Sequence, residues 1–85
     1  MSEKDSELHH ECVNRFIALA NAMKDEKIDI NIVNAGLMTA AGLYATYVAG
    51  GNDGGLTESG VDKVSEVFCN ELKRIQVIKK EAAAR

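Results

Sequence analysis

The sequence predicts an all-α protein: a three-helix domain with a buried apolar middle helix, which dimerises into a helical bundle. Three observations lead to this fold class. Proline is absent, and the good helix formers alanine, leucine, lysine and glutamate are plentiful. Apolar residues recur at steps of three and four towards both ends of the chain, as they do on one face of a helix. Between these regions, residues 34–51 carry no charge.

The first helix is predicted over about residues 3–23. Ser2 can cap its start, and Asp5 is favourable in the first turn, where the helix dipole attracts negative charge. A single apolar stripe then repeats with helical spacing, which is typical of an amphipathic helix with one buried face. The stripe consists of Leu8, Cys12, Phe16, Leu19 and Met23.

Residues 24–31 interrupt this pattern with a charged segment. Residues 28–31 alternate between apolar and polar, so a short strand is an alternative, but an isolated strand would have no partner. We therefore expect a connection in which Asp29 or Asn31 caps the second helix. That helix is predicted over about residues 32–49. Glycines follow it, and the glycine-rich residues 50–55 are expected to form a flexible loop.

The third helix is predicted over about residues 58–80. Thr57 is a good N-cap, and Leu56 and Val61 are placed for a hydrophobic staple. Residues 81–85 continue the helical propensity and are expected to fray. Its apolar stripe consists of Val61, Val64, Phe68, Leu72, Ile75 and Ile78.

The size of the chain limits what it can bury alone. Its 85 residues make one domain, 1–85. Domains of this size bury only about 60% of their unfolded surface, and they often rely on disulfides, metals or oligomerisation.

Cys12 and Cys69 make no disulfide framework, and we expect two thiols in a reducing cytosol. The polar N-terminus lacks the pattern of a secretory signal, so the predicted location is cytoplasmic.

The uncharged middle helix must be covered by lipid, by its own chain or by another chain. Its 18 residues are at the lower limit for a membrane span, its small residues insert poorly, and basic flanks are missing, so no membrane partner is expected. The stripes of the other two helices cover about two-thirds of its circumference. A second copy, related by a two-fold axis, would close the remaining arc. The predicted dimer interface consists of Ala35, Met38, Thr39, Gly42, Ala45, Thr46 and Ala49.

Three segments resemble a known family. They are "NRFIALAN" in the first helix, "AAGLYATYVA" in the second, and the charged amphipathic third helix. Together they resemble the small bacterial all-helical proteins of domain-of-unknown-function family 3144, over roughly residues 14–75. The resemblance implies a bacterial, all-helical protein and no particular activity.

Motifs for catalysis or for cofactors are largely missing. Residues 50–57 match the spacing of a phosphate-binding loop, but Leu56 replaces the lysine and a helix precedes the loop instead of a strand. The loop also lacks the ligand spacing of an EF-hand. We expect no cofactor and no bound nucleotide.

The segment "HHEC" offers candidate metal ligands. His9 and Cys12 lie three residues apart on one helix, and His10 and Cys69 would complete the four ligands of a closed zinc site. The alternative places the histidines on a solvated helix edge and Cys12 in the core, and the sequence favours it. A nucleophilic Cys12–His9 pair would need an oxyanion hole, which no motif indicates, so no enzyme is expected.

Two polar features leave alternatives open. Asn34 lies within the apolar helix and needs a hydrogen bond, either at a dimer interface, where it would set the register, or to a ligand. The basic end of the third helix is interleaved with glutamates, so a solvated helix end is favoured over nucleic-acid binding. Its basic residues are Lys73, Arg74, Lys79, Lys80 and Arg85.

The sequence therefore predicts a non-enzymatic helical homodimer that acts through protein contacts. One alternative is a protein that binds a small apolar ligand between its helices, with Met38, Tyr44 and Tyr47 lining the cavity. The other is nucleic-acid binding through the basic end of the third helix. Partner, pathway and ligand do not follow from the residues.

Overall fold

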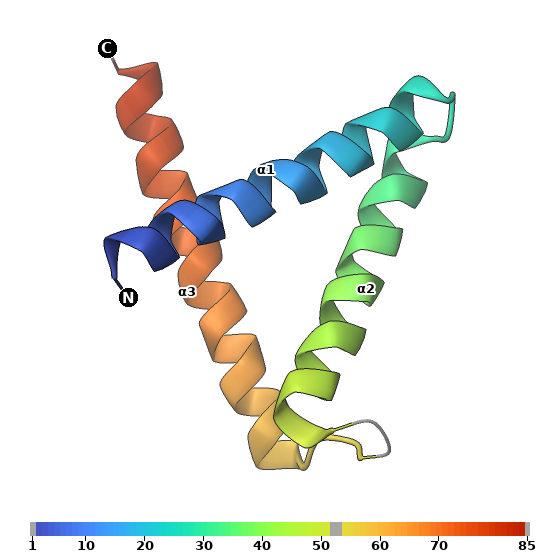
Figure 1. Ribbon diagram of the computed structural model, residues 1–85, viewed down its shortest axis with the longest axis vertical. Coiled ribbons are helices and arrows are strands. Elements are labelled where there is room, and N and C mark those ends of the chain that lie inside the picture. The colour runs from blue at the N-terminus through green and yellow to red at the C-terminus, as the bar shows by residue number, and fades with distance from the viewer. Residues whose placement is uncertain (1, 52–53, 85) are drawn as a thin grey trace. The chain divides into compact units, whose positions relative to one another are not determined.

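The computed structural model describes residues 2–51 and 54–84, and these residues form three helices and no strand (Figure 1). The helices are α1 (Glu3–Asp25), α2 (Ile30–Gly50) and α3 (Glu58–Ala83). The all-α, three-helix prediction is thereby confirmed. All three helices are longer than predicted: α1 and α3 end later, and α2 begins two residues earlier. Of the alternating residues 28–31, the last two belong to α2, and none forms a strand.

Side chains cap the start of each helix, as the sequence predicts. Each cap accepts a hydrogen bond from a backbone N–H in the first turn, at 3.1 Å for the Ser2 hydroxyl, 2.8 Å for the Asp29 carboxylate and 3.1 Å for the Thr57 hydroxyl. These bonds satisfy amide groups that have no partner within the helix. Asp29, and not Asn31, is the cap of α2.

The chain turns after the end of α1 at Lys27, whose backbone has a left-handed conformation. The N–H of Lys27 donates to the carbonyl of Lys24 at 3.0 Å, and that of Ile28 donates to the carbonyl of Met23 at 3.3 Å. This pair of bonds is the Schellman pattern. Lys27 has a φ of 73°, a conformation that is usually adopted by glycine.

Glycine ends α2 as expected. Gly51 has a φ of 79°, and its N–H donates to the carbonyl of Tyr47 at 2.8 Å. The predicted flexible loop includes Asn52 and Asp53, which lie outside the described residues.

The chain divides within α2 into two units, Met1–Gly42 and Leu43–Arg85. None of the described residues is buried. The half-buried residues lie near the two helix connections: Ala20, Met23 and Val33 in the first unit, and Ala45, Thr46, Leu56, Gly60 and Val64 in the second. The predicted burial of the middle helix is therefore not achieved within the single chain.

Candidate interaction surface

Helix α2 exposes large apolar side chains along its length. Leu43 and Tyr44 are each 68% exposed, and Val48 is 71% exposed. No lysine, arginine, aspartate or glutamate occurs between Ile30 and Gly50. Large exposed apolar patches are typical of surfaces that bind protein, membrane or ligand, so this helix is the candidate interaction surface. The helix is also long and apolar enough to cross a membrane.

The residues predicted for the dimer interface lie on this helix. Ala45 and Thr46 are half-buried, and the others are exposed: Ala35, Met38, Thr39, Gly42 and Ala49. A Cβ atom built on Gly42 meets no atom within 4 Å, and the same is true of Gly36. A single added methyl group at either position would therefore meet no obstacle within the chain.

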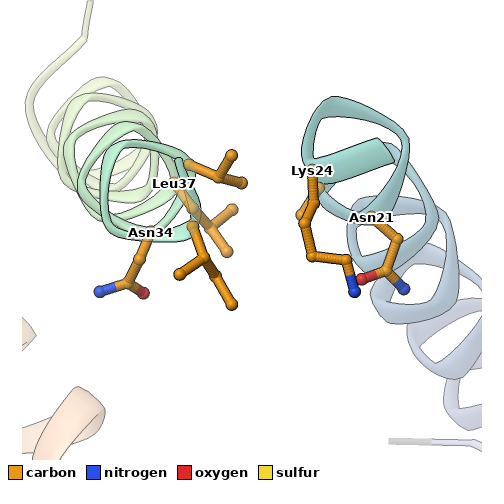
Figure 2. Close-up of a pocket in the computed structure, with 7 residues that line it drawn as sticks. Asn21, Lys24, Asn34 and Leu37 are labelled. Atoms are coloured by element: carbon orange, nitrogen blue, oxygen red, sulfur yellow. The ribbon is translucent and has the colours of Figure 1, made fainter. Parts of the chain in front are cut away.

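A small hollow of about 190 Å³ opens between α1 and α2 in the first unit. Leu37 of α2 points toward α1 across it, and Asn34, Asn21 and Lys24 also line it (Figure 2). Pockets for drug-sized ligands usually measure about 300–1,000 Å³, so this hollow is too small for one.

The side chains proposed for an apolar ligand cavity do not line this hollow. Tyr44 and Tyr47 form a tilted pair with ring centroids 5.9 Å apart and an interplanar angle of 51°. Both are exposed, as is Met38. The amide nitrogen of Asn34 lies 4.0 Å from the sulfur of Met38, which is a weak contact on an exposed helix face.

The candidate metal ligands are not assembled. Among residues 2–51 and 54–84, no three His, Cys, Asp or Glu side chains lie close enough to hold a metal ion together. His9, His10, Cys12 and Cys69 are all exposed. The alternative interpretation also needs correction, because Cys12 is exposed and not in a core.

The basic end of α3 carries one ion pair that the sequence did not predict. Arg74 binds Glu71 of the preceding turn, and its Nε donates to the carboxylate at 2.8 Å. Lys73, Lys79 and Lys80 lie on the same half of the helix. Arg85 lies outside the described residues.

The chain exposes more surface than a folded monomer of its mass. Its accessible surface is 7479 Å². For a protein of 9.2 kDa, the size scaling of monomers gives about 4,900 Å². The chain therefore exposes about 2,600 Å² more than the scaling gives for such a monomer.

Comparison with known proteins adds no relative to this description. No protein-family model, curated protein or solved structure matches the chain. The resemblance to family 3144 therefore stays a prediction.

Proposed function

We propose that the protein is a non-enzymatic, cytoplasmic helical homodimer that acts through protein contacts. Two copies pair through the small residues of α2 between Ala35 and Ala49. The single observation that carries this proposal is the exposure of large apolar side chains along an uncharged helix. Hydrophobic burial at about 25 cal/mol per Å² makes such a surface a strong driving force for association.

The small residues of α2 explain why a second copy is a suitable partner. Glycine, alanine and threonine allow two helix backbones to approach closely, and a two-fold axis places the same surface on both sides of the contact. Large side chains such as Leu43 and Tyr44 then remain to pack around the close approach.

Sedimentation equilibrium at micromolar concentration, in buffer without detergent, tests this proposal. We expect a species of twice the 9.2 kDa chain mass. A well-folded monomer under these conditions would exclude the homodimer.

The competing interpretations have separate signatures in the same preparation. A protein that sediments as a defined species only in detergent, and that floats with lipid vesicles, would use α2 as a membrane segment. A co-purified small molecule in native mass spectrometry would favour a ligand-binding protein. Salt-sensitive retardation of DNA would favour nucleic-acid binding.

A further inference from the structure

Helix α3 carries an apolar stripe that its own unit, Leu43–Arg85, leaves exposed. Val61, Phe68 and Leu72 follow one another at spacings of seven and four residues, so they share one side of the helix. They are 48%, 50% and 44% exposed. Val64, which lies between Val61 and Phe68 on the same side of α3, is half-buried, as is Gly60. We call the three exposed residues the free stripe.

A row of polar residues borders the free stripe. Its five members are spaced by four, seven, four and seven residues, which places them on one line along the helix. Glu58 lies three residues before Val61, and Cys69 lies three residues before Leu72. Residues three apart are neighbours on a helix surface, so the polar row runs beside the free stripe. The members of this charged row are Glu58, Asp62, Cys69, Lys73 and Lys80.

The charge of this row changes sign at its centre. Glu58 and Asp62 precede Cys69, and Lys73 and Lys80 follow it. Glu58 and Lys80 stand at equal distances from Cys69, eleven residues to either side, or about 16 Å along the helix axis. In a copy that runs in the opposite direction about Cys69, Glu58 therefore faces Lys80, and the acidic half of the row lies along the basic half. Asp62 and Lys73 then face the uncharged Gln76 and Ser65. A copy in the parallel direction would oppose like charges.

We propose that α3 pairs with α3 of a second copy in an antiparallel arrangement, through the free stripe and the charged row, with the two Cys69 residues near the two-fold axis. A chain contains one α3, so only a second copy can supply this match. An interface on a two-fold axis also requires a self-complementary surface. The inference rests on the proposed homodimer and adds what determines the direction of pairing.

The charges of the row can determine the direction in which the two chains pair. Opposed charges at the edge of an apolar contact select the orientation and register of partners more than they raise affinity. The surface of α2 has no charge with which to do so. In the proposed assembly, α2 therefore provides buried area, and α3 determines the relative direction of the two chains.

Cross-linking with a short bis-maleimide, which joins two thiols, tests the geometry. Cys12 and Cys69 are the two cysteines of the chain, and both are exposed, so replacing either leaves the helices intact. We expect Cys12→Ser to yield a covalent dimer and Cys69→Ser to yield none. A dimer in solution that links only when both cysteines are present would place α1 of the partner on α3 and overturn the proposal.

A charge-exchange experiment tests the direction of pairing. Glu58→Lys and Lys80→Glu each oppose like charges twice in their own homodimer, and each should weaken self-association about tenfold. A mixed dimer of the two variants restores both opposite-charge pairs. One variant is labelled uniformly with ¹⁵N, because exchanging glutamate and lysine changes the chain mass too little to separate the dimers. We expect the mixed dimer to exceed the statistical half of an equimolar mixture in native mass spectrometry. Each variant changes its own helix end equally in both kinds of dimer, so the effect of the helix dipole cancels.

The matched control is Lys63→Glu, because Lys63 lies on α3 but outside the charged row and away from the free stripe. It should leave self-association unchanged. Mixed dimers at the statistical proportion would overturn the α3 proposal and leave the homodimer standing. A parent protein that sediments as a monomer would instead refute the homodimer itself.

Discussion

Helices α2 and α3 both expose apolar residues, but they differ in what surrounds those residues. On α2 the apolar surface extends around the helix without any charge. On α3 a narrow stripe is bordered by charged residues whose sign changes halfway along the helix. Burying an uncharged apolar surface lowers the free energy in many relative orientations of two helices. A border with an acidic half and a basic half favours one of these orientations. In the proposed dimer, affinity would therefore come mainly from α2, and the relative direction of the chains from α3.

The largest expected effect is on the α2 contact. Gly42→Leu should weaken dimerisation at least about a hundredfold, because each added side chain obstructs the close approach of the two helices and overpacking costs about 1–3 kcal/mol per site. Sedimentation equilibrium measures the change. Within the chain, a Cβ on Gly42 meets no atom within 4 Å, so the variant should still fold.

Gly36→Leu is the matched control for this variant. Gly36 also lies on α2 and is equally open within the chain, but it is not among the predicted interface residues. Equal loss of dimer in both variants, or in neither, would show that the interface has been placed on the wrong side of α2.

A smaller effect is expected on the apolar part of the α3 contact. Phe68→Ala should cost about 1–2 kcal/mol per chain in dimerisation, since roughly half of a large apolar side chain is available for burial by a partner. Val77→Ala provides the comparison, because Val77 is 55% exposed on the opposite side of α3. Analytical ultracentrifugation should separate the two variants, and equal affinities would argue against a partner on the free stripe.

A high salt concentration should weaken the contribution of α3 to dimerisation and leave that of α2 unchanged. At about 1 M salt the Debye length falls to about 3 Å, so the charges of α3 no longer select a direction, whereas burial on α2 is not weakened. We expect the excess of mixed dimers between Glu58→Lys and Lys80→Glu to disappear while the dimer mass persists. A dimer that dissociates as the salt concentration rises would mean that charge, and not apolar area, holds the chains together.

The smallest effect lies outside both surfaces, at the end of α1. Lys27→Gly should raise the free energy of unfolding by up to about 1 kcal/mol, because glycine adopts the left-handed conformation of this position without strain. Lys27→Ala removes the same charge but keeps the strain, so it should not stabilise. Chemical denaturation at a fixed protein concentration measures both variants, and an equal gain in both would assign the effect to charge.

The sequence by itself determined the three helices and their starts. Ser2, Asp29 and Thr57 each bind a backbone N–H two or three residues further on, so their role depends on neighbours in the chain alone. Helical spacing likewise predicts which residues share a side of α1 or α3. The left-handed Lys27 was not predicted, since glycine is the usual signal for this conformation and is absent here.

Only the tertiary structure decided which parts of each stripe the chain covers. The sequence places Val64 and Phe68 on one continuous stripe. In the structure Val64 is mostly covered by other residues, whereas the Phe68 side chain is 50% exposed. It likewise predicts a buried middle helix, whereas the folded chain leaves Leu43, Tyr44 and Val48 exposed. The physical reason is that periodicity reports which side of a helix is apolar, while burial depends on how far a second surface extends along it.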